Sequence, residues 1–121
     1  MGHVHVKATL VGEKRSREFS DLLVDTGAAF TVLPPEVIHD IGAILRPRKI
    51  RLELGDGRKV DAEEYVLDIM LEGREGSTFA LTFKDAKPVL GVLTMESLGL
   101  KVNPVSGKVE AARPPGVAYY Y

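Results

Sequence analysis

The stretch from residue 22 to residue 33 constrains this chain more than any other part of it. Three apolar residues at positions 22–24 lead into Asp25, Thr26 and Gly27, and an apolar, β-branched run at positions 30–33 leads away again. This pattern predicts a tight turn that carries one carboxylate between two buried strands. Gly27 suits such a turn because glycine tolerates backbone angles that are closed to other residues, and the Thr26 hydroxyl can fix the loop. A surface turn with a solvated aspartate uses the same residue types.

The stretch resembles the active-site segment of the retropepsin-like aspartic proteases, in which apolar residues precede Asp-Thr-Gly-Ala or Asp-Ser-Gly-Ala. The resemblance implies that Asp25 is catalytic and that Thr26, Gly27 and Ala28 form its active-site loop. It further implies that the Thr26 hydroxyl reaches across to the loop of a partner copy and that the Gly27 backbone faces the substrate. The implied fold is mainly β, a closed retropepsin-like β-barrel with one or two short helices, in a homodimer.

Only one Asp-Thr-Gly occurs in the chain, although aspartic proteolysis needs two carboxylates around one water molecule. No other aspartate combines the apolar lead-in with a following Thr-Gly; these are Asp21, Asp40, Asp56, Asp61, Asp68 and Asp85. The second carboxylate must therefore come from another copy, which predicts a homodimer with Asp25 and its symmetry mate at the two-fold axis. The expected activity is that of a metal-independent aspartic endopeptidase, without a cofactor, acting on extended peptides or unfolded proteins.

Two other functional hypotheses stay open at this stage. The first is a catalytically silent peptide-binding or dimerisation module of the same fold. The second is an unrelated small β-barrel. The intact Asp25, Thr26 and Gly27 favour the enzyme over the silent module, and formation of a dimer with a buried Asp25 would oppose the unrelated barrel.

A glycine-bearing hairpin is predicted in the middle of the chain. Residues 46–54 and 59–71 alternate between apolar and polar side chains, and Gly55, Asp56 and Gly57 lie between them. Asp-Gly accepts the positive φ angles of a tight turn. The retropepsin fold places its flap here, so these three residues are candidates for substrate binding, although a plain surface hairpin has the same local pattern. The basic residues of this region are expected to form a solvated strand face, not a site for an anionic partner.

A second apolar-apolar-Gly motif, Val89, Leu90 and Gly91, precedes a predicted helix that Gly99 closes. It resembles the second signature of the family, a buried strand that supports the catalytic loop. Retroviral members often carry an arginine soon after this glycine, where the present chain has Val92 and Leu93, as many cellular relatives do.

The remaining segments complete a mainly β pattern. Strands are predicted at residues 3–11, 17–24 and 78–83, with Phe79, Leu81 and Phe83 in register, and a turn at residues 73–76. A short helix is expected to start after Pro34 and to end before Gly42. A last hairpin at residues 100–109 is the candidate dimer contact. Residues 1–112 are assigned to the protease domain and residues 113–121 to an extended tail with three tyrosines.

Composition limits the other classes of function. A chain of 121 residues is long enough for one domain, and its net charge of −1 gives no reason to expect nucleic acid or membrane as partner. There is no cysteine, which excludes disulfides and thiolate metal sites. His3 and His5 have a spacing that can bind a metal, but no third ligand follows, and no metal is predicted. No secretory signal or membrane span is recognised, so a cytoplasmic location is expected. Glutamine is absent and Asn103 is the sole asparagine, a bias reported for hyperthermophile proteins.

Overall fold

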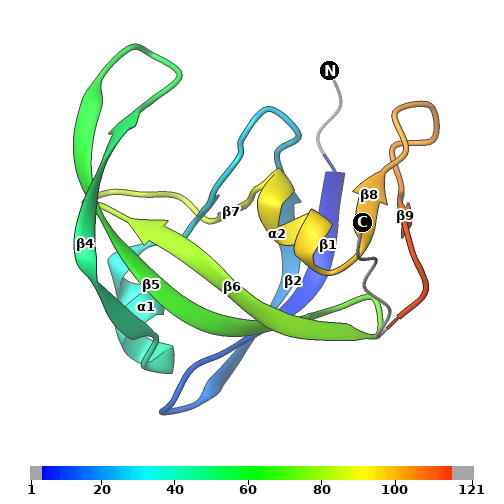
Figure 1. Ribbon diagram of the computed structural model, residues 1–121, viewed down its shortest axis with the longest axis horizontal. Helices are drawn as coiled ribbons and strands as arrows, with labels where there is room; N and C mark the ends of the chain where they lie inside the picture. Colours follow the sequence, from blue (N-terminus) through cyan, green and yellow to red (C-terminus); the bar gives the residue numbers. More distant parts are fainter. Residues whose placement is uncertain (1–3, 116–121) are drawn as a thin grey trace, which may run out of the picture.

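A computed structural model describes residues 4–115 of the chain, and this part is mainly β with two short helices (Figure 1). The prediction of a mainly β chain with one or two short helices is confirmed. The strands and helices follow one another as β1 (Val4–Val11), β2 (Ser16–Val24), β3 (Thr31–Val32), α1 (Pro35–Ile41), β4 (Ile44–Glu53), β5 (Lys59–Leu71), β6 (Arg74–Thr82), β7 (Val89–Leu90), α2 (Val92–Ser97), β8 (Leu100–Val102) and β9 (Val109–Ala111).

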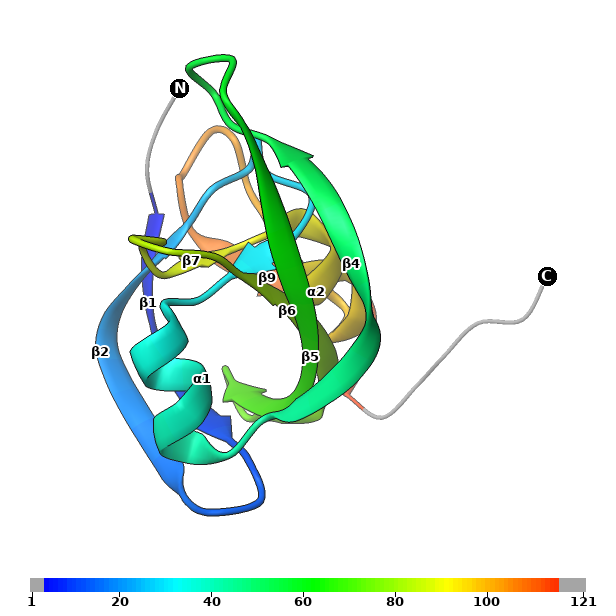
Figure 2. The same ribbon diagram turned by 90° about the vertical axis from the view of Figure 1, so that its left-hand side faces the viewer.

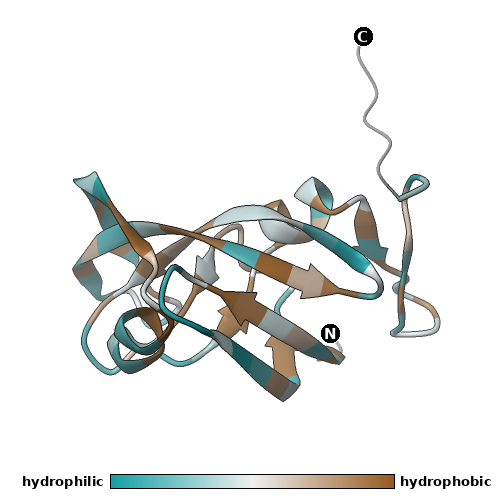
Figure 3. Cartoon of the chain, turned by 90° about the horizontal axis from the view of Figure 1, so that it is seen from below, coloured by the Kyte–Doolittle hydropathy of each residue, from teal (hydrophilic) through white to brown (hydrophobic). Residues whose placement is uncertain are grey.

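Seven of these strands form one sheet in the order β1-β2-β7-β3-β6-β5-β4, and β1 also pairs with β5. The predicted first hairpin is confirmed, because β1 and β2 pair antiparallel with Val6 opposite Leu22. The core lies between the strands, where Leu10, Leu22 and Ile69 are fully buried. Figure 3 shows that hydrophobic residues are concentrated along these strands while many of the turns are hydrophilic.

The long central hairpin follows the predicted alternation closely. β5 has the predicted bounds, and its residues Tyr65, Leu67, Ile69 and Leu71 are all buried, since side chains two positions apart share one face of a strand. β4 begins at Ile44, two residues before the predicted start. Its pairing with β5 is irregular between Leu45 and Lys49, around a proline that has no N–H to donate to a neighbouring strand.

Two local predictions about β6 were wrong. The turn before it is formed by Glu72 and Gly73, which both have positive φ angles (53° and 70°), and Arg74 already belongs to the strand. A two-residue turn of this kind matches the twist of the strands that it joins. The expected apolar face is also interrupted, because Phe79 is 52% exposed while Leu81 is fully buried. β6 is covered on both faces only near its end, so the simple alternation fails there.

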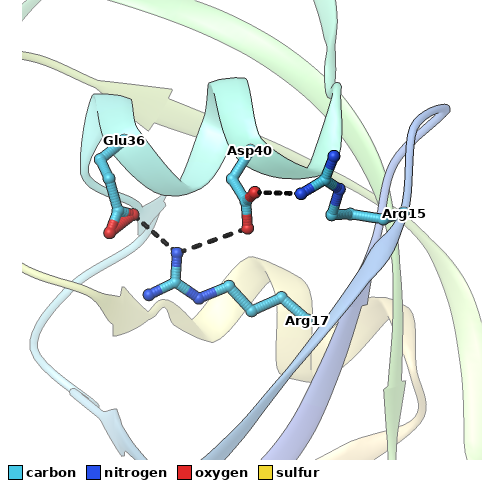
Figure 4. Close-up of polar contacts among 4 residues, drawn as sticks. All are labelled: Arg15, Arg17, Glu36 and Asp40. Atoms are coloured by element: carbon cyan, nitrogen blue, oxygen red, sulfur yellow. Dashed lines mark hydrogen bonds and ion pairs between the residues drawn. The ribbon is translucent and has the colours of Figure 1, made fainter.

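Helix α1 packs Val37, Ile38 and Ile41 into the core and ends at Gly42, which has the left-handed conformation (φ 73°) that glycine adopts readily. Figure 4 shows how its outer face is linked to the first hairpin. Arg17 lies 2.6 Å from Glu36 and 3.7 Å from Asp40, and Arg15 lies 3.0 Å from Asp40. The acceptor carboxylate of Glu36 and the charge of Asp40 raise the pKa of Arg17. Exposed ion pairs add little stability, so these contacts chiefly orient the helix.

The predicted last hairpin is confirmed as β8 and β9, which form a separate two-stranded sheet. Beyond it, the Arg113 guanidinium donates hydrogen bonds to the carbonyls of Glu96 and Ser97, both at 2.9 Å. Arg113 therefore packs on the C-terminal end of α2, where cations are favoured, although the predicted domain boundary placed it in the tail. The tyrosines of that predicted tail lie outside the described residues, as does His3.

Candidate active-site loop

Asp25 lies on the loop between β2 and β3, and two backbone hydrogen bonds and one to its carboxylate define its position. Its N–H donates to the carbonyl of Leu90 (3.0 Å), and its carbonyl accepts from the N–H of Ala28 (3.0 Å). The N–H of Gly27 donates to the carboxylate oxygen Oδ1 of Asp25 at 2.9 Å. An aspartate that accepts a hydrogen bond two residues onward forms a compact turn. Asp25 is partly buried, while Thr26 and Gly27 are exposed.

The second predicted motif lies directly beside this loop. β7 sits between β2 and β3, parallel to β2 (Val24 opposite Leu90) and antiparallel to β3 (Val32 opposite Val89). Leu90 is fully buried, which explains the apolar character of the strand. The start of α2 continues the contact, because the N–H groups of Val92 and Leu93 donate to the carbonyls of Ala28 and Ala29 at 2.8 and 3.0 Å. The loop is thus attached along its length to β7 and α2.

Gly91 allows the loop to lie this close. A Cβ atom at position 91 would be 2.4 Å from the carbonyl carbon of Phe30 and 2.5 Å from the carbonyl oxygen of Ala29, far inside van der Waals contact. The φ angle of Gly91 is −93°, which any residue can adopt, so the requirement for glycine is one of space.

A buried cluster of three threonine hydroxyls connects β3, which follows the loop, with β6 and α2. Thr31 and Thr94 share a hydrogen bond of 2.5 Å, and Thr94 and Thr78 share one of 2.8 Å. The N–H of Gly91 donates to Thr31 at 3.1 Å. The cluster joins β3, β6 and α2. Sequence reasoning missed it, because nothing local to three threonines so far apart in the chain indicates that their side chains meet.

The predicted hairpin tip at Gly55, Asp56 and Gly57 is exposed and closes as a tight turn. Gly57 has a φ angle of 88°, and its N–H donates to the carbonyl of Leu54 at 2.9 Å. The Asp56 carboxylate accepts the backbone N–H of Arg58 (3.0 Å) and its Nε (2.8 Å). These two hydrogen bonds, the backbone one first, hold the pKa of Asp56 below its ordinary value. Figures 1 and 2 show the tip at the same end of the molecule as the Asp25 loop.

Within residues 4–115, no group of three or more His, Asp or Glu side chains is placed to hold a metal ion. His5 instead pairs with Asp21, with Nδ1 and Oδ1 3.1 Å apart. Neither helix that the structure describes has the length and apolar character to cross a membrane.

No protein-family model matches this chain, and no curated protein matches it.

Proposed function

We propose that the chain is an aspartic endopeptidase of the retropepsin type, active as a homodimer in which each copy contributes one Asp25. The observation that carries this proposal is the Asp25 loop: a partly buried carboxylate, oriented by the Gly27 N–H, on a loop attached to a strand threaded between β2 and β3. The pairing of β1 with β5 supports the closed barrel that this family would require.

Two such carboxylates around one water molecule would perform the hydrolysis. Like charges this close cannot both be ionised, so one carboxyl holds a proton. The ionised Asp25 takes a proton from the water, whose oxygen attacks the peptide carbonyl carbon, while the protonated Asp25 donates a hydrogen bond to the carbonyl oxygen. The carbon–nitrogen bond then breaks as the leaving amine gains a proton. In each copy the Gly27 hydrogen bond to Oδ1 fixes the orientation of the carboxylate.

The proposed substrate is an extended peptide or an unfolded protein. Such a peptide would lie between the Asp25 loops and the hairpin tips at Gly55, Asp56 and Gly57, recognised as an added strand. The proposed contact between copies is the sheet of β8 and β9, whose strands pair only with each other in the described part of the chain. Their outer edges therefore offer backbone groups to a second copy.

The test is cleavage of casein by the purified protein between about pH 3 and pH 8, using the acid range over which carboxyl groups ionise. Asp25→Asn should abolish cleavage while the chain stays folded and dimeric, because the new amide oxygen still accepts the Gly27 N–H. Asp21→Asn is the matched control, because Asp21 is an exposed aspartate within β2, four residues before Asp25, and this variant should retain activity.

Pepstatin should inhibit the cleavage and EDTA should not. Activity that survives in Asp25→Asn would remove Asp25 from its proposed role, and loss of activity with EDTA would indicate a metal enzyme. A folded dimer that binds peptides without cutting them would favour the silent binding module.

A further inference from the structure

An apolar hollow of about 240 Å³ lies beside the Asp25 loop. Its apolar lining comes from three different elements: Phe30 follows the Asp25 loop, Phe79 is on β6 and Leu93 is on α2. These side chains are 38%, 52% and 52% exposed. Across the sheet, Phe79 lies opposite Val66 and Val66 opposite Ile44, which is itself half exposed, so the apolar surface continues along the outer face. A contiguous patch of exposed apolar side chains such as this one is typical of a surface that binds another segment or molecule.

The polar lining of the hollow carries no uncompensated charge. Glu64 is only 3% exposed, and its two carboxylate oxygens accept hydrogen bonds from Nε and Nη2 of Arg48 at 2.8 and 3.1 Å. The Arg48 side chain itself stays 65% exposed. A guanidinium held flat by two parallel hydrogen bonds can stack on an aromatic ring. The hollow therefore fits an uncharged occupant with aromatic side chains.

Arg113, near the end of the described part of the chain, contacts a residue that lines this hollow. Ser97 belongs to its lining, and the carbonyl of Ser97 accepts a hydrogen bond from Arg113. The N–H of Arg113 donates to the carbonyl of Gly99. A Cβ atom at position 99 would lie 2.7 Å from Cγ of Arg113, so glycine makes room for this contact. Pro114 and Pro115 follow Arg113, whose side chain is bound at the C-terminal end of α2.

The six residues that follow have the matching chemistry. Residues 116–121 read Gly-Val-Ala-Tyr-Tyr-Tyr, without a charged side chain in a protein that is 27% charged, and they hold three of its four tyrosines. Six extended residues reach up to about 20 Å, whereas a six-residue helix such as α2 is about 9 Å long. The segment is thus long enough to pass along α2 to the far side of the hollow.

We infer that the tyrosine segment, residues 116–121, binds in the hollow formed by Phe30, Phe79, Leu93 and Arg48 of its own chain. The segment lies outside the described residues, and the inference rests on the hollow, the position of Arg113 and the sequence that follows it. It holds whether or not Asp25 is catalytic, since none of its contacts uses that carboxylate.

A tryptophan reporter tests this inference, because the chain has no tryptophan of its own. Phe79→Trp places the single indole at the hollow. Its emission is compared between the otherwise unchanged chain and one that also carries Tyr119→Ser, Tyr120→Ser and Tyr121→Ser. We expect the emission to move to the red and its quenching by iodide to increase when the tyrosines are removed. Val105→Trp is the control, at a 95% exposed position in the β8–β9 turn, and should not respond to the serine substitutions.

A second measurement covers the case in which Phe79→Trp does not fold. The methyl NMR signals of Leu93 should shift between the natural chain and the triple serine variant, whereas those of the fully buried Leu10 should not. The inference would be overturned if neither the tryptophan emission nor the Leu93 methyl signals changed when the tyrosines were replaced. A response that disappears on dilution would assign the hollow to the segment of a second copy and would also overturn it. Neither result depends on casein cleavage, so the proteolysis proposal stands or fails separately.

Discussion

At the scale of single residues, Gly91 decides how close the Asp25 loop can lie to β7 and α2. Gly91→Ala would force a methyl group against the backbone of Phe30 and Ala29, which cannot move away as a flexible side chain can. We expect the free energy of unfolding in urea to fall by about 3 kcal/mol, the upper end for overpacking. Gly55→Ala is the control, since a Cβ atom there meets nothing within 4 Å, and its effect should stay within about 0.5 kcal/mol. Equal losses in both variants would contradict the steric explanation.

Asp56 gives a prediction about pH at the hairpin tip. The hydrogen bonds from Arg58 lower its pKa, so its titration in the folded protein should have a midpoint below about 3.9, the ordinary value for aspartate. The stability that these bonds add is present above that ordinary pKa and is lost as the pH falls through the lower folded value. NMR titration of the carboxyl group measures the midpoint. In Arg58→Ala the midpoint should rise only part of the way toward the ordinary value, because the backbone N–H of residue 58 still donates to the Asp56 carboxylate. A midpoint that returns fully to the ordinary value would assign the lowered pKa to the Arg58 side chain alone.

At the scale of elements, the threonine cluster joins β3 to β6 and α2. Thr31→Val keeps the shape of the side chain but removes the acceptor of the Gly91 N–H and a partner of Thr94. We expect a loss of about 1–3 kcal/mol in the free energy of unfolding, the cost of leaving buried polar groups without partners. Thr82→Val is a matched control, because Thr82 is also buried and its hydroxyl has no partner among the described residues. That substitution should be neutral or stabilising, and an equal loss there would refute the role of the cluster.

The sequence was most informative where the pattern was long and local. Thirteen alternating residues predicted β5 with its bounds, and Pro35 and Gly42 predicted α1. The Asp25 loop and the motif at Val89, Leu90 and Gly91 were both recognised, but their parallel pairing joins segments far apart and has no local signature. The exposure of Phe79 was missed for a related reason, since it depends on which elements happen to cover β6.

At the scale of the whole molecule, the proposed site exists only when two chains meet. Mixing the natural chain with an equal amount of Asp25→Asn therefore tests the pairing directly. Random exchange leaves about one quarter of the dimers with two aspartates, so the activity should fall to about one quarter of that of the natural chain at the same total concentration. If each chain acted alone, the mixture would retain about one half of the activity of the natural chain. The mixture must be allowed to exchange partners before it is assayed on casein.

The position of β7 also bears on how the molecule acquires its shape. This strand lies between β2 and β3, yet it is the last of the seven strands of the sheet along the chain: Val24 pairs with Leu90, and more than half of the 121 residues lie between them. Contacts between such distant segments form slowly, because a long loop must close before they are made. A chain still emerging from the ribosome has Asp25 exposed well before the strand that supports it has been made. The loop around Asp25 is thus completed only after residues 89–91 have been made, which would keep the proposed protease silent until then among other unfolded chains.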